Sequence, residues 1–138
     1  MTTEQSKLLA KRFFEEVLNR GDVSVIEEMV ADDFVEHEEL PGVPPTRDGI
    51  IAWATMMRQA FPDLMATMNN MVAEGDELWV HYTMRGTHLG EFLGIPATGR
   101  SVEVNGFDRV KIRNGKAIEH WGQSDTLGML QQLGQIPA

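Results

Sequence analysis

The segment DELWVHYTMRG, residues 76–86, decides the class of fold because its side chains alternate between two kinds. One set is apolar and consists of Leu78, Val80, Tyr82 and Met84. The other set consists of Trp79, His81, Thr83 and Arg85. A period of two is typical of a β-strand with two distinct faces. The segment therefore predicts a strand of a sheet that has something packed on one face.

Before this strand, the apolar residues recur at the spacing of helices. Apolar side chains three and four positions apart predict an amphipathic helix over about residues 3–19 and a shorter one over 22–30. Residues 32–45 are polar and rich in proline and glycine, so they are expected to form a loop. A third helix is expected over 46–61, where Pro62 ends it.

After this strand, the period of two continues. Strands are expected over residues 102–112 and 116–125, joined by a hairpin at Asn114-Gly115, and an earlier strand over 64–74. A short helix is expected over 126–133. Helices first and an antiparallel sheet afterwards are typical of an α+β domain whose helices pack on one sheet face. We expect one domain over residues 1–138.

Composition excludes several classes of protein. The chain has 138 residues, 21 acidic against 12 basic side chains, and a net charge of -9, which disfavours nucleic acid and anionic membranes as partners. It has no cysteine, and its four histidines include no helical pair at i, i+4, so we expect no metal site. No stretch has the roughly 20 apolar residues of a membrane helix. We therefore expect a cytoplasmic protein.

Two long stretches carry a resemblance to a known family. They are GTHLGEFLGIPATGRSVEV, residues 86–104, and NGKAIEHWGQSDTLGMLQQLG, residues 114–134. The shorter segments FFEEVLNRGD and FVEHEELPG, at 13–22 and 34–42, extend the match over nearly the whole chain. The sequence resembles the SnoaL-like polyketide cyclases, a branch of the nuclear transport factor 2-like superfamily.

The resemblance implies a fold and a chemistry. The fold would be a cone: a strongly curved antiparallel sheet wrapped on three N-terminal helices, with one short C-terminal helix and a pocket at the wide end. Relatives of this kind close a ring by intramolecular aldol chemistry, without metal or cofactor, and use an Asp as general acid/base. The matching position here is Asp125, in HWGQSD. His88 and Gln123 are the further catalytic candidates.

The parity of the last strand agrees with this assignment. If Trp121 forms pocket wall, then Gln123 and Asp125, two and four residues later, face the same cavity, and His120 faces the other side. An Asp before a short helix is also a common N-cap, so both roles stay open for Asp125. The side chains expected to bind an apolar, carbonyl-rich molecule are Phe14, Val17, His37, Trp53, Met57, Phe61, Tyr82, Phe107 and Trp121.

Two other functions remain open on the sequence. One is a binding module of the same fold, in which Asp125 only caps a helix. The other is a hydrolase that opens epoxides, for which Asp108 and Arg109 are candidates, although Gln123 stands where an Asp-Arg-Asp cluster would need an acid. The outer sheet face, with Trp79 and His81, predicts a homodimer because such a patch is better buried than wet.

Overall fold

The computed structural model describes residues 2–138, and its helices begin and end close to the expected positions. Thr2 caps the first helix through a reciprocal pair of hydrogen bonds with Gln5. The first helix continues beyond α1 as a π-helical segment, and a single 3-10 turn precedes α2. The helical elements are α1 (Thr3–Arg12), the π-helical segment (Phe13–Asn19), the 3-10 turn (Val23–Val25), α2 (Ile26–Met29), α3 (Arg47–Ala60) and α4 (Thr126–Gln132).

The five strands form one open sheet in the order β1-β5-β4-β3-β2. They are β1 (Val30–Glu36), β2 (Met65–Glu74), β3 (Glu77–Thr87), β4 (Ser101–Arg113) and β5 (Lys116–Ser124). Every neighbouring pair is antiparallel except β1 and β5, which are parallel, so the sheet is mixed.

The strand β1 was not expected from the sequence, which predicts helix and then loop in this region. The burial of Val30 and Phe34 holds it against the core, while polar side chains lie between them. The pairing with β5, distant in sequence, supplies hydrogen bonds that no local pattern announces. The edge of the sheet therefore contains a segment that leads directly into the loop around residue 40.

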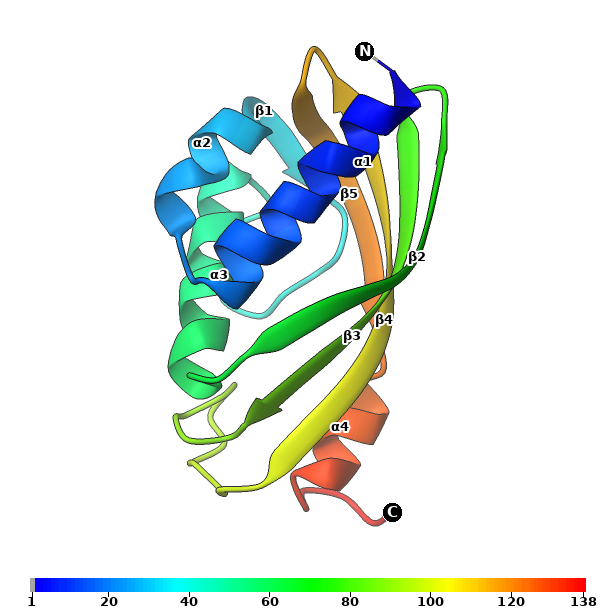
Figure 1. Ribbon diagram of the computed structural model, residues 1–138. Helices are drawn as coiled ribbons and strands as arrows, with labels where there is room; N and C mark the ends of the chain where they lie inside the picture. The colour runs from blue at the N-terminus through cyan, green and yellow to red at the C-terminus, as the bar shows by residue number, and fades with distance from the viewer. Residues whose placement is uncertain (1) are drawn as a thin grey trace.

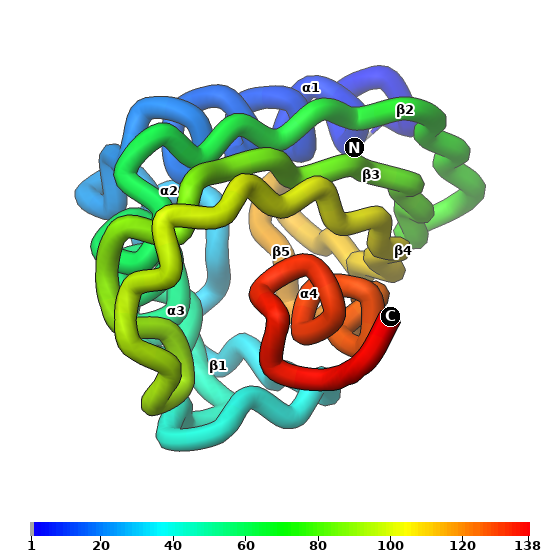
Figure 2. Tube along the Cα trace, turned by 90° about the horizontal axis from the view of Figure 1, so that it is seen from below, coloured from blue at the N-terminus to red at the C-terminus, as the bar shows by residue number. Residues whose placement is uncertain are grey.

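The sheet curves around α1, α2 and α3, which all lie on its concave side (Figure 1). Seen from below, the strands arch around the interior, and α4 lies at the end of the molecule that faces the viewer (Figure 2). The short helix α4 packs on β4. The expectation of an α+β cone with the sheet wrapped on three helices is confirmed, but the sheet is mixed and not antiparallel throughout, because β1 adds to its edge in parallel with β5.

The parity of the strands fixes which side chains enter the interior. Leu78 and Val80 on β3 are buried on the concave face, whereas Trp79 is 50% exposed on the convex face. The partner of His81 on β4 is Phe107, which is 59% exposed and stacks on the His81 ring. Even-numbered residues of β3 and β4 therefore point inward, and odd-numbered residues point outward.

None of the helices in residues 2–138 is long and apolar enough to cross a membrane.

Candidate active site

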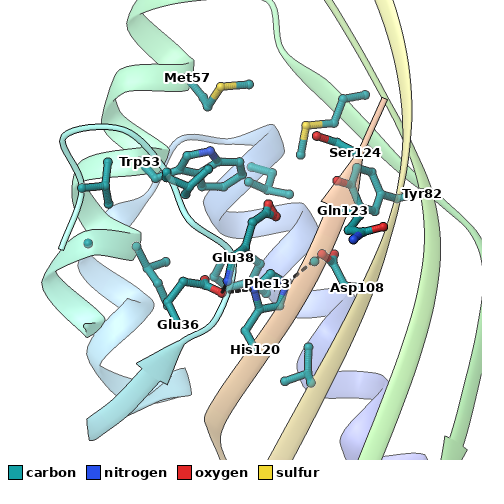
Figure 3. A pocket seen from close by; sticks show the side chains of 18 of the residues that line it. Phe13, Glu36, Glu38, Trp53, Met57, Tyr82, Asp108, His120, Gln123 and Ser124 are labelled. Carbon is teal, nitrogen blue, oxygen red and sulfur yellow. Dashed lines mark hydrogen bonds and ion pairs between the residues drawn. The ribbon is translucent and has the colours of Figure 1, made fainter. Parts of the chain in front are cut away.

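A cavity of about 1160 Å³ lies between the concave sheet face and the helices. Trp53 and Met57 from α3 form one wall, and Tyr82 from β3 stands on the opposite wall (Figure 3). Most of the remaining lining is aliphatic or aromatic, including Phe13 and Phe34. A concave, largely apolar space with a few polar groups is the usual form of a small-molecule site.

The polar groups of the cavity are concentrated around His120 (Figure 3). Its Nδ1 lies 2.5 Å from Oε2 of Glu36, and its Nε2 lies 2.8 Å from Oδ1 of Asp108. Burial disfavours the charged imidazolium, but the hydrogen bonds with Asp108 and Glu36 outweigh it and raise the pKa of His120 to about 10. The ring is therefore an imidazolium near neutral pH, and both of its N–H groups donate to carboxylates.

Strand pairing brings these three residues together. Glu36, at the end of β1, pairs in register with His120 on β5. Asp108 on β4 pairs with Gly122, two positions along β5 from His120, so Asp108 and His120 share the concave face. Only the meeting of three strands produces the cluster.

Glu38 is the carboxylate of this group that has no hydrogen-bond donor on the described residues 2–138. Its backbone N–H donates to Oε2 of Glu36 at 3.2 Å, and its side chain reaches into the cavity (Figure 3). Burial raises the pKa of Glu38, the charge of His120 lowers it, and the charges of Asp108 and Glu36 raise it further, with a net rise. A carboxylate in this situation is a stronger base than one in water.

Tyr82 supplies a hydroxyl on the same wall. Burial raises the pKa of Tyr82 well above its ordinary value, and the negative charges of Asp108 and Glu38 act in the same direction. The phenol therefore keeps its proton at any physiological pH. Its ring is held edge-on against Phe14, with centroids 6.0 Å apart, so the hydroxyl is a fixed donor.

Seven of the site residues predicted from sequence line this cavity, and five do not. The seven are Phe14, His37, Trp53, Met57, Phe61, Tyr82 and Gln123. The five that lie outside the lining are Val17, His88, Phe107, Trp121 and Asp125.

Asp125 is the N-cap of α4. Its side chain accepts a hydrogen bond from the backbone N–H of Gly128, with Oδ1 at 2.9 Å, and the residue is exposed. This is the capping role that the sequence left open. The inference that Asp125 faces the cavity rested on Trp121 as pocket wall, and that premise is wrong. Trp121 lies on the convex side, where it stacks on His37 with ring centroids 4.6 Å apart.

The other three residues lie apart from the cavity for different reasons. Val17, on the π-helical segment, is buried in the hydrophobic core. Phe107 is on the convex face. His88 is fully buried at the end of β3, where its Nδ1 accepts the Thr98 backbone N–H at 3.2 Å and its ring lies against Phe61. These contacts give His88 a structural role: it holds the loop that follows β3.

Glu36, Glu38 and His120 line the cavity but were not predicted as site residues from the sequence, and Asp108 was a candidate only for hydrolysis. A signal was present: the acids in Glu36-His37-Glu38 alternate, as strand residues on one face do. It was not used because residues 32–45 were predicted to form a loop. His120 was placed on the wrong side because parity was counted from Trp121.

Arg109 belongs to the convex face and not to the cavity. It pairs with Glu77 and lies against the rings of Trp79 and Trp121, at 5.6 and 4.2 Å from their centroids. An Asp-Arg-Asp cluster of the hydrolytic kind is therefore not formed by Asp108 and Arg109.

Fold and site define a class of protein: a curved α+β cone that encloses a small-molecule cavity with acid/base groups on one wall. Comparison with known proteins identifies the family. The model of the SnoaL-like polyketide cyclases matches residues 8–133, so the chain belongs to this family.

Individual relatives agree with this assignment. The aklanonic acid methyl ester cyclase DauD of Streptomyces sp. (strain C5) is 27% identical over 124 residues, which cover 87% of this chain and 76% of the relative. TsrD from Streptomyces laurentii superposes with a TM-score of 0.90 at 28% identity, covering 99% of both chains. IdmH from Streptomyces antibioticus is 34% identical, with a TM-score of 0.79 and coverage of 94% and 98%.

Proposed function

We propose that the protein closes a ring in an apolar, carbonyl-rich polyketide by an intramolecular aldol reaction in which Glu38 is the general base. The observation that carries the proposal is a half-buried carboxylate, free of hydrogen-bond donors from residues 2–138, that faces an apolar cavity beside two further carboxylates. Such surroundings favour proton uptake by Glu38 from a carbon acid.

The reaction balances without a co-reactant. Glu38 removes a proton from a carbon flanked by two carbonyl groups. The resulting enolate carbon attacks a ketone of the same molecule and forms the new carbon–carbon bond. The alkoxide oxygen of the former ketone then takes the proton back from the Glu38 carboxyl group. The sum is an isomerisation of the substrate, and the enzyme returns to its starting state.

Other side chains of the cavity support the same assignment. The protonated phenol of Tyr82 is a donor for the enolate oxygen. The imidazolium of His120 holds Glu36 and Asp108 in place and offsets part of their charge. The apolar walls formed by Trp53 and Met57 suit a flat ring system and exclude water.

Two variants test the proposal, with aklanonic acid methyl ester as the substrate because it appears in the names of two relatives. Glu38→Gln keeps the size of the side chain and removes the base, so its kcat should fall roughly 10²-fold or more. Asp125→Asn is the matched control, and its kcat should stay near that of the parent. Product formation is followed by chromatography. If Glu38→Gln keeps the kcat of the parent, or if Asp125→Asn loses its kcat instead, Glu38 is not the general base.

A further inference from the structure

The three residues that begin with Glu36 run beside the three that begin with His120. Glu36 pairs with His120 in the parallel register of β1 and β5, and the two are joined by the hydrogen bond of 2.5 Å. One step further, the ring of His37 stacks on Trp121 with only 7° between the planes. The same register places Glu38 beside Gly122.

Gly122 is the one member of these pairs without a side chain, and its backbone does not demand glycine. Its φ is not among the positive values found for other glycines of residues 2–138. The space around it is the relevant feature. A Cβ atom at Gly122 would lie 2.6 Å from Oε1 of Glu38, 2.7 Å from Cε1 of His120 and 3.0 Å from Oδ1 of Asp108.

All three of these contacts are with the ends of side chains, and none is with backbone. Separations below 3.0 Å are not tolerated between a Cβ atom and its neighbours, so both the Glu38 carboxylate and the His120 ring would have to give way. His120 and Asp108 restrain one another through their hydrogen bond of 2.8 Å, and His120 is also held by Glu36. The Glu38 carboxylate has no such restraint and makes the shortest contact, so it is the group that a side chain at position 122 would displace furthest.

We propose that Gly122 is a positioning residue of the cyclase: the absence of a side chain there admits the Glu38 carboxylate to its place beside His120. This inference rests on the proposed role of Glu38 as the base. Gly122 does not touch the reacting atoms, and its influence on the rate passes through Glu38. Chemistry at this wall is then sensitive to the smallest possible side chain, a single methyl group.

The test is a double-mutant cycle of Gly122→Ala and Glu38→Asp. Gly122→Ala should lower kcat/KM for aklanonic acid methyl ester at least about tenfold, because small displacements of a catalytic group are costly. Glu38→Asp withdraws the carboxylate by one methylene and makes room for the methyl group. The double variant should therefore be less impaired than the product of the two single effects.

The pKa of Glu38 can be measured directly, without turnover. In protein labelled with ¹³C at glutamate carboxyl groups, the raised pKa of Glu38 should move back toward its ordinary value of 4.5 in Gly122→Ala, because the displaced carboxylate is better hydrated. The acidic limb of the pH–rate profile should move to lower pH in the same variant, since the base is then deprotonated earlier.

Urea unfolding is a third test, which also serves if Gly122→Ala folds poorly. Glu38→Ala removes the group that the methyl would meet, so it should recover much of the urea midpoint lost in Gly122→Ala. Additive changes in midpoint together with an unchanged Glu38 pKa would overturn the positioning role. If Glu38→Gln is fully active but the cycle is coupled, the placement of Glu38 by Gly122 stands and the proposed base is wrong.

Discussion

Raising the pH should destabilise this protein through a single histidine. His120 has a pKa of about 10 in the folded protein, against 6.5 for an ordinary histidine, because it is bound by Glu36 and Asp108. A group whose pKa is raised by folding stabilises the fold fully below its unfolded pKa. That contribution is lost as the pH rises from about 6.5 to about 10.

The size of the effect follows from the difference in pKa. Each pKa unit corresponds to about 1.4 kcal/mol, so the free energy of unfolding should fall by at most about 5 kcal/mol across this interval. Partial hydration of the cluster reduces this value, since the His120 side chain is 20% exposed. We expect a loss of a few kcal/mol, which is a large part of the stability of a domain of this size.

The assay is urea unfolding at several pH values between about 6.5 and about 9.5, with the His120 Cε1 proton followed by NMR. His120→Gln should remove most of the pH dependence, although it should also lower the stability at neutral pH. His81→Gln is the control, because His81 stacks on Phe107 at the convex face and forms no ion pair with residues 2–138. A His120 proton that titrates near 6.5, or parallel stability curves for the parent and His120→Gln, would refute the reasoning.

Three further variants test individual features. Asp125→Ala removes the hydrogen bond to the start of α4 and should cost about 1 kcal/mol in urea unfolding while kcat/KM is retained; a large loss of rate would restore Asp125 to the mechanism. Trp121→Ala removes the ring that His37 stacks on, so this residue of the cavity lining should lose its fixed position and kcat/KM should fall. Trp121→Phe keeps an aromatic ring there and should retain the kcat/KM of the parent. Trp79→Glu places a charge on the convex face, where we propose that two copies of the chain meet; sedimentation should change from a dimer to a monomer, and a parent that already sediments as a monomer would contradict the dimer.

The fold was largely predictable because its main elements carry local periodic signals. Alternation in residues 76–86 identified β3, and the spacing of apolar residues identified α1 and α3 within a few positions. The Asn114-Gly115 turn lies between β4 and β5 as expected, with positive φ at both residues. These signals arise between neighbours in the sequence, so a single sequence contains them.

The site was less predictable because strand pairing creates it. The apolar wall that includes Trp53 and Met57 followed from helix periodicity, and both residues line the cavity in the structure. The acid/base group did not follow, because Glu36 and His120 are far apart in the sequence and meet only when β1 pairs with β5. The alternating acids around His37 are the only local sign of a strand, and they do not identify β5 as its partner.

The orientation of β5 also depends partly on the sequence and partly on the tertiary structure. The sequence by itself determined that Trp121 and Gly122 face opposite sides of their strand, since that depends only on the period of two. Which of the two sides encloses the cavity was decided by the curvature of the whole sheet around α1 and α3. A strand has no intrinsic inside, so its orientation becomes defined only when distant helices bury one face of the sheet.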